Sequence, residues 1–230
     1  MSAGMHSFSR LPSDQEVLGE LLHSLSQPLT SLRCSLELSI DEAPDQYPRT
    51  VAAALEQTQA AVEMVQLMRE YLDAEHGGVF AAAVELLPVL RNICDDLVSI
   101  AETRGIQVRL MGTCSTTVGI DESRLRRALQ YLIMAVIEQQ ESGCAITVSL
   151  GEVPSGTLLR VQGSRSVQSQ SSNGTERNSR SHPPRASLNM RWARRATAVR
   201  MLESVGLAVT FDDEGPGFSL QIPVANLPVV

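Results

Sequence analysis

The 230-residue sequence contains no lysine, because all 19 of its basic residues are arginine. A lysine nucleophile, a Schiff base and a phosphate-binding P-loop are therefore excluded. Aromatic residues are also scarce, at 3% with a single tryptophan, Trp192, which argues against surfaces that stack sugars or single-stranded nucleic acid. The net charge of −7 weakens polyanion binding further, so we expect no nucleic-acid partner.

Two further absences concern membranes and metal ions. No stretch approaches the roughly 20 apolar residues that cross a bilayer, and residues 1–10 lack the layout of a signal peptide. We therefore expect a cytoplasmic protein without a membrane partner. Cys34, Cys94, Cys114 and Cys144 are too widely spaced for a zinc knuckle or a redox dithiol, and we expect neither a metal ion nor a cofactor.

The first half of the chain carries a leucine repeat. A capping box at residues 13–16 predicts a helix start. The leucines after it recur every seven residues in two series, Leu18, Leu25, Leu32 and Leu22, Leu29, Leu36. A second helix, predicted from about Thr50 to Glu75, has a weaker seam of Val51, Leu55, Val62, Val65 and Leu72. Because two helices alone bury little, we expect a tail at residues 1–12 and then, at residues 13–76, an antiparallel hairpin that pairs with a second copy into a four-helix bundle.

Beyond Gly77-Gly78, the expected domain boundary, helix and strand patterns alternate. Helices are predicted at 86–103, 121–140 and 188–205, and strands at 106–110, 115–120, 145–150, 157–161, 207–211 and 218–223. Residues 164–187 are rich in serine and arginine and predict a flexible loop. The expected fold class is α+β: the helical hairpin, then an α/β sandwich over residues 79–230 with helices on one face of a mixed sheet.

One short stretch carries chemistry. Leu22-His23-Ser24-Leu25-Ser26-Gln27-Pro28-Leu29-Thr30 lies inside the first predicted helix, and His23 falls outside the leucine seam. A neutral imidazole on a helix surface is a competent nucleophile at neutral pH. From residue types alone, ordinary solvated side chains are the favoured interpretation of His23 and Gln27.

This stretch resembles the H-box of two-component sensor histidine kinases, which reads His-Glu/Asp-Leu-x-Thr/Gln-Pro-Leu-Thr. The resemblance spans roughly Val17 to Pro223, since the second half follows the element order of that family's ATP-binding sandwich. Residues 121–129 are similar to the start of the helix that carries the asparagine box. The resemblance implies that His23 is the phosphoacceptor, with Ser24, Gln27 and Pro28 as auxiliary residues and Gln27 contacting an incoming phosphoryl group or a water.

The family's nucleotide-binding residues are missing, so we expect no ATP binding. Ala135 stands where an asparagine would ligate Mg²⁺. After the strand ending at Val161, Gln162 and its neighbours supply no carboxylate where the family has Asp-x-Gly-x-Gly. Residues 213–217 match that motif by letter but lie between the last two predicted strands, so we interpret them as a turn. Ser24 also replaces the acidic residue that follows the family's histidine.

The segment 160–200 contains nine arginines and one acid, Glu176. Arg191, Arg194 and Arg195 lie on the last predicted helix, where they could dock an acidic receiver domain or an anion. A solvated helix face that balances an acidic body is the alternative interpretation.

The leading hypothesis is a phosphorelay histidine phosphotransfer protein that passes a phosphoryl group between His23 and aspartates of response-regulator receiver domains without ATP. The alternative is a non-catalytic pseudokinase scaffold that binds or sequesters a response regulator. A third possibility is an active ATP-dependent histidine kinase.

Overall fold

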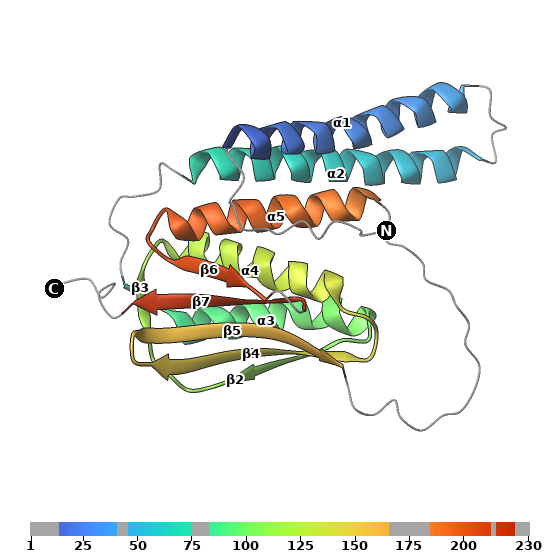
Figure 1. Cartoon of the computed structure of the whole chain (residues 1–230). Helices are drawn as coiled ribbons and strands as arrows, with labels where there is room; N and C mark the ends of the chain where they lie inside the picture. The colour runs from blue at the N-terminus through green and yellow to red at the C-terminus, as the bar shows by residue number, and fades with distance from the viewer. Residues whose placement is uncertain (1–13, 41–45, 75–82, 166–184, 213–214, 224–230) are drawn as a thin grey trace, which may run out of the picture. The chain divides into compact units, whose positions relative to one another are not determined.

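A computed structural model describes residues 14–40, 46–74, 83–165, 185–212 and 215–223 (Figure 1). By its internal contacts the chain divides into two compact units, Met1–Met68 and Arg69–Val230. This division falls inside the second helix, whose last turn belongs to the second unit. The expected tail at residues 1–12 and the expected boundary at Gly77-Gly78 lie outside the described residues.

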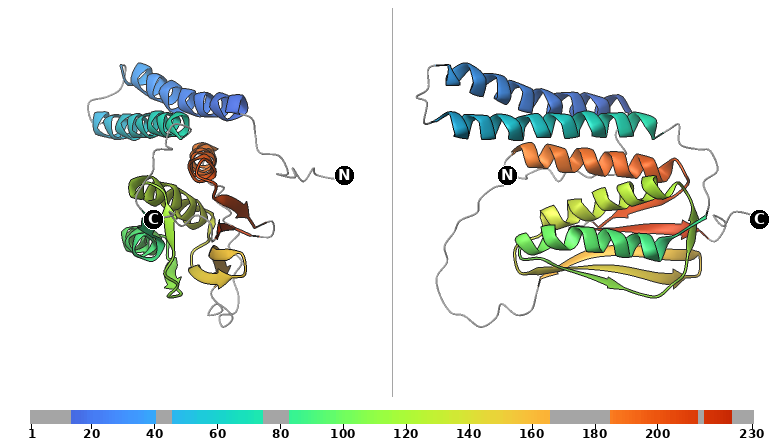
Figure 2. Two further views of the ribbon diagram at one scale, coloured as in Figure 1. Left: turned by 90° about the vertical axis from the view of Figure 1, so that its left-hand side faces the viewer. Right: turned by 180° about the vertical axis from the view of Figure 1, so that it is seen from behind.

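The first unit contains two long antiparallel helices, α1 (Asp14–Ser39) and most of α2 (Tyr47–Asp73) (Figure 2). The predicted antiparallel hairpin is therefore confirmed. α2 begins three residues before the predicted Thr50, because Pro48 is tolerated in the first turn of a helix, where its missing N–H would have no partner.

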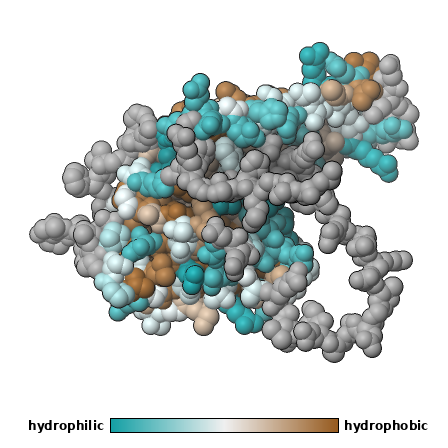
Figure 3. Space-filling model, viewed as in Figure 1, coloured by the Kyte–Doolittle hydropathy of each residue, from teal (hydrophilic) through white to brown (hydrophobic). Residues whose placement is uncertain are grey.

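The predicted apolar seam of the hairpin is its exposed face. Leu18, Leu25 and Leu32 are half-buried. The other seam residues are 48–65% exposed: Leu22, Leu29, Leu36, Val51, Leu55, Val62, Val65 and Leu72. Figure 3 shows apolar side chains on the outside of the hairpin, most clearly near its loop end. The buried stripe of α1 is a different one, formed by Val17, Leu21, Ser24 and Pro28.

The second unit contains the sandwich. Its elements are β1 (Ala83–Glu85), α3 (Leu86–Thr103), β2 (Gln107–Met111), β3 (Thr117–Gly119), α4 (Glu122–Gln139), β4 (Cys144–Val153), β5 (Gly156–Arg165), α5 (Arg185–Glu203), β6 (Ala208–Phe211) and β7 (Gly217–Pro223). Five strands form one sheet in the order β2-β4-β5-β7-β6, with β2 parallel to β4 and the other pairs antiparallel. The predicted mixed sheet is confirmed. β1 pairs with β3 in a separate ribbon that the sequence analysis did not predict.

Helices α3, α4 and α5 pack on one face of this sheet, as predicted (Figure 2). The strands follow the period of two, because alternate residues such as Ile146, Val148 and Leu150 are buried while their neighbours are partly exposed. α4 supplies much of the core through Leu125, Leu129 and other side chains that are essentially inaccessible. Each such leucine contributes roughly 1.5–3 kcal/mol by its removal from water.

The two boundaries that flank the predicted loop 164–187 differ from the sequence prediction. β5 continues to Arg165 because it pairs with β4 along its whole length, from Gly156↔Val153 to Arg165↔Cys144. α5 begins at Arg185 and not at Leu188. The predicted loop 164–187 therefore loses residues at both ends to regular structure, and its middle, 166–184, lies outside the described residues. No described helix combines the length and apolar character needed to cross a membrane.

Candidate functional site

The hairpin presents His23 on the exposed side of α1. Gln27 lies one turn further along, and its Nε2 is 3.4 Å from Nε2 of the imidazole. The hydroxyl groups on the same face are engaged with the helix backbone: Ser26 Oγ donates to the carbonyl of Leu22 at 2.9 Å, and Thr30 Oγ1 donates to that of Ser26 at 2.8 Å. The imidazole is exposed, and the side-chain contact it makes among the described residues is with the Gln27 amide.

Ser24 and Pro28 lie on the buried side of the same helix. Ser24 is only 4% exposed, and its hydroxyl has no hydrogen-bond partner among the described residues. Pro28 has no N–H to offer the carbonyl of Ser24, four residues earlier. Of the four predicted residues around the phosphoacceptor, the structure thus brings His23 and Gln27 together and places the Ser24 and Pro28 side chains away from the exposed face.

At the sandwich positions where the resemblance expects nucleotide-binding residues, the chain has side chains of other types. Ala135 is buried on α4 and offers no ligand to a cation. Within β5, Gln162 donates its side-chain amide to Asp212 Oδ2 at 3.4 Å. Gly163 leaves no room for a side chain, because the amide of Gln140 lies against the position that a Cβ would occupy. Within the described residues no three His, Cys, Asp or Glu side chains converge as a metal site would require.

A cavity remains between α4 and the turn that joins β6 to β7. It is lined by Ala135 and Gln139 of α4, by Arg195 of α5, and by Phe211, Asp212 and Gly217 around the turn. The Arg195 guanidinium lies over the Phe211 ring, 3.7 Å from its centroid, a cation–π contact. Burial and then the nearby positive charge of Arg191 lower the pKa of Arg195. The Phe211 ring in this cavity is therefore covered by the chain's own guanidinium.

The other two predicted docking arginines have an internal partner. Arg194 Nη1 is 2.6 Å from Glu138 Oε1, and Arg191 Nε is 3.9 Å from Glu138 Oε2. The side chains of Arg191, Arg194 and Glu138 are at most 18% exposed. This geometry favours a role in joining α5 to α4, and the docking of a partner by these arginines stays a prediction.

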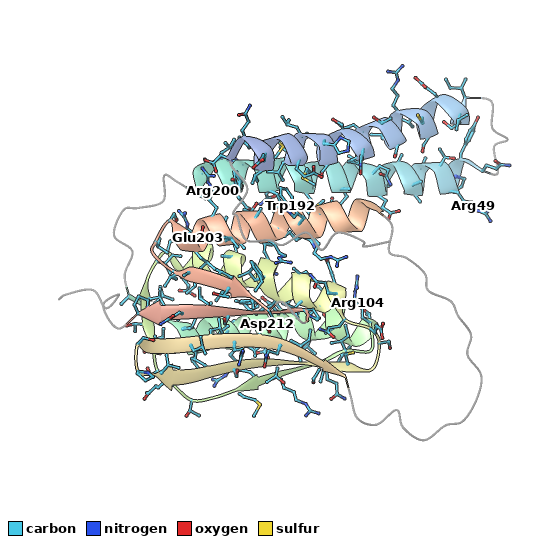
Figure 4. The ribbon with its side chains drawn as sticks, viewed as in Figure 1. Arg49, Arg104, Trp192, Arg200, Glu203 and Asp212 are labelled. Carbon is cyan, nitrogen blue, oxygen red and sulfur yellow. The ribbon has the colours of Figure 1, made fainter. Side chains whose placement is uncertain are left out.

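A polar cluster that the sequence analysis did not find holds the last turn of α2. Glu70 accepts hydrogen bonds from Arg127 and, at 2.8 Å, from the Tyr131 hydroxyl. Tyr71 accepts from Arg200 Nη1 at 2.7 Å, and the same guanidinium lies 4.3 Å from the Tyr71 ring centroid. Arg200 is labelled on α5 in Figure 4. We call these contacts, together with those of Ala74, the α2 anchor.

The third part of the α2 anchor involves the backbone. Arg124 donates to the carbonyl of Ala74 and, at 2.7 Å, to the Ser204 hydroxyl. A cation at the C-terminal end of a helix also meets the negative end of its dipole. The sequence signal was present, because Arg124, Arg127 and Tyr131 recur at spacings of three and four on α4 and share one face. Their partners, however, lie 50 or more residues away in the sequence.

Burial and then the hydrogen bond and charge of Glu70 raise the pKa of Tyr131. Its hydroxyl therefore stays protonated and remains a donor to the carboxylate. Burial opposes the charge on Arg127, but the hydrogen bond and charge of Glu70 outweigh it and raise the Arg127 pKa. Both partners of Glu70 thus keep the protonation state that the α2 anchor needs.

Comparisons with known proteins place this geometry in context. No protein-family model and no curated protein sequence matches the chain. Among solved structures, the chain is similar to the histidine kinase AdeS of Acinetobacter baumannii, with a TM-score of 0.66 at 18% identity, covering 89% of this chain and 98% of that one. It is also similar to the histidine kinase ThkA in its complex with the response regulator protein TrrA, with a TM-score of 0.61 at 13% identity; the match covers 90% of this chain and 61% of that one.

Proposed function

We propose that this chain, which has the fold of a histidine-kinase core, is a histidine phosphotransfer protein of two-component signalling. It takes a phosphoryl group from an aspartyl phosphate of one response-regulator receiver onto His23 and passes it to the aspartate of another. The observation that carries the proposal is an exposed imidazole on a kinase-like hairpin, in a chain whose described sandwich residues have Ala135 and Gln162 at the positions where the resemblance expects ligands of Mg·ATP. The structure of ThkA bound to TrrA supports a receiver domain as the partner.

The transfer needs one nucleophile from this chain. The imidazole lone pair attacks phosphorus, an N–P bond forms, and the bond from phosphorus to the aspartate oxygen breaks, so that the carboxylate leaves with the electron pair. The remaining ring proton passes to water. Delivery to the second receiver is the reverse sequence. Because each receiver brings its own Mg²⁺ and acidic pocket, this chain needs no metal ligand of its own.

The residues present do not fit a bound Mg·ATP. The Ala135 side chain offers no oxygen to the cation. Gln162 supplies an amide in place of a carboxylate, and that amide already donates a hydrogen bond to Asp212. In addition, the Arg195 guanidinium already covers the Phe211 ring in the adjoining cavity. These contacts support phosphotransfer over the ATP-dependent kinase, and no step of the proposed reaction passes through ATP.

Ser24 favours a second candidate, the non-catalytic scaffold that binds or sequesters a response regulator. An acidic residue at this position would stabilise a developing imidazolium, whereas the Ser24 hydroxyl carries no charge and is buried. A scaffold would use the exposed face of α1 for binding and would leave His23 unmodified.

The source of the phosphoryl group separates these functions. The purified chain is incubated with radiolabelled, phosphorylated receiver domains, and separately with labelled Mg·ATP, and acid-labile label on the chain is measured. We expect label from a receiver and none from ATP. Label from ATP alone would contradict the proposal and indicate a kinase. Receiver binding with no label from either source would indicate the scaffold.

We also propose that two copies of the chain pair through the exposed seam of the hairpin. Seven seam residues of the first unit are about half exposed: Leu22, Leu29, Leu36, Val51, Leu55, Val62 and Val65. Exposed apolar residues that recur on both helices mark an interface, and their spacing matches the packing of a second helical hairpin. The occupant we propose is therefore a second copy of this chain.

Replacing Leu29 by glutamate is expected to dissociate this dimer. In a symmetric dimer the substitution places two new carboxylates in the interface, one from each copy. Each buried polar group without a partner costs about 1–3 kcal/mol, so the dissociation constant of the dimer should rise on the order of 100-fold. Sedimentation velocity over a concentration series measures it. Ser31→Glu, an exposed position outside the seam, is the matched control. A wild-type chain that stays monomeric at all concentrations would overturn this assembly.

A further inference from the structure

We propose that Gln27 is a positioning residue that holds the His23 imidazole in the tautomer used for phosphoryl transfer; this inference rests on the proposed function of His23. The two side chains are one helical turn apart, and their Nε2 atoms are 3.4 Å apart. An amide nitrogen can donate a hydrogen bond but not accept one, so the ring nitrogen it contacts is the acceptor. A neutral imidazole has a single acceptor nitrogen, hence the proton sits on Nδ1 and the lone pair on Nε2.

This tautomer suits a nucleophile on a helix surface. The hydrogen bond at one ring nitrogen decides where the proton of a neutral imidazole resides. Among the described neighbours, the Ser26 and Thr30 hydroxyls donate to backbone carbonyls, so neither can also donate to the ring without giving up that bond. The side chain of Ser24, the nearest residue in sequence, is buried. Gln27 is therefore the side chain placed to select the tautomer.

The same amide can follow the reaction. When the Nε2 lone pair forms the N–P bond, it is no longer available to Gln27, and the bond from phosphorus to the receiver's aspartate breaks with release of the carboxylate. The Gln27 N–H then has a new acceptor in an oxygen of the transferred phosphoryl group. The proton on Nδ1 leaves to water, which gives the neutral phosphohistidine. Gln27 donates throughout and never takes a proton itself.

The proposal is tested first without any phosphoryl donor. Long-range ¹⁵N–¹H correlation spectra of the full chain, recorded at a pH where the ring is neutral, report the ratio of the two His23 tautomers. Removing the donor with Gln27→Leu should lower the Nδ1–H to Nε2–H ratio about threefold, the effect of a modest exposed hydrogen bond. Gln27→Glu should lower it further, because a carboxylate only accepts and favours the Nε2–H form.

Gln59→Glu, an exposed position on α2, controls for the added charge and should leave the ratio unchanged. The rate of transfer from a phosphorylated receiver is then measured for the same variants, and it should fall in step with the tautomer ratio. A ratio that neither Gln27 variant changes would overturn the role of Gln27, even if His23 is labelled normally. Ratios that shift as expected in a chain never labelled on His23 would uphold tautomer selection and reject the proposed function.

Discussion

His23→Ala is expected to receive no acid-labile label from phosphorylated receivers, while the wild-type chain is labelled. The imidazole is the only group on the exposed face of α1 that our mechanism uses as a nucleophile, so its removal leaves no atom to accept phosphorus. The side chain is exposed and alanine is the better helix former, so the variant should keep its fold and its stability. The measurement is autoradiography after incubation with a labelled receiver, with circular dichroism as the check on folding.

The control for this experiment is a second histidine. The chain has four histidines, and His76→Ala should be labelled as the wild type is. Receiver binding that is equal in wild type and His23→Ala, with neither protein labelled, would favour the scaffold. Label retained in His23→Ala would show that another residue accepts the phosphoryl group and would contradict the proposed role of His23.

The sequence predicted elements whose ends are decided locally. α3 spans Leu86–Thr103 in both the prediction and the structure, because Gly105 follows its end and takes a positive φ of 69°. α4 begins where Asp121 accepts a hydrogen bond from the backbone N–H of Arg124. The hydrogen bond from the Ser123 hydroxyl and then that backbone bond lower the pKa of Asp121. Such signals lie within a few residues of the boundary they set.

Features that depend on distant partners were not predicted. β1 has three residues and exists through its pairing with β3, more than 30 positions later. Whether Ser24 is buried depends on how α1 is rotated about its axis. The heptad pattern alone does not decide whether the leucine seam or the neighbouring stripe with Ser24 faces inward. For the candidate site, the motif therefore identified His23 and Gln27, whereas the side-chain directions of Ser24, Arg191 and Arg194 came from packing and ion pairing.

The α2 anchor has a consequence for where the sandwich begins. Sequence composition places the start at residue 79, but contacts place Arg69–Asp73 with the second unit. Tyr71 and Ala74 are at most 3% exposed, and Ala74 belongs to the same apolar core as α3 and α4. Without this turn, Arg127 would lose its bond to Glu70, Arg200 its bond to Tyr71, and Arg124 its bond to the Ala74 carbonyl. Arg124 would keep the Ser204 hydroxyl, but burial already lowers its pKa, so the loss of one hydrogen bond by this partly buried cation is costly.

A fragment of residues 69–230 is therefore expected to fold, and one of residues 79–230 to be strongly destabilised or unfolded. In the full chain, Tyr71→Ala should lower the free energy of unfolding by about 3–5 kcal/mol, as for other large buried aromatics. Leu72→Ala, at the neighbouring 49% exposed position, should cost well under about 1.5 kcal/mol. Urea titrations followed by the fluorescence of Trp192, the single tryptophan, report on the second unit because this residue lies on α5. Equal stability of the two fragments, with equal costs for the two substitutions, would show that the turn is dispensable and that the sandwich begins at residue 79.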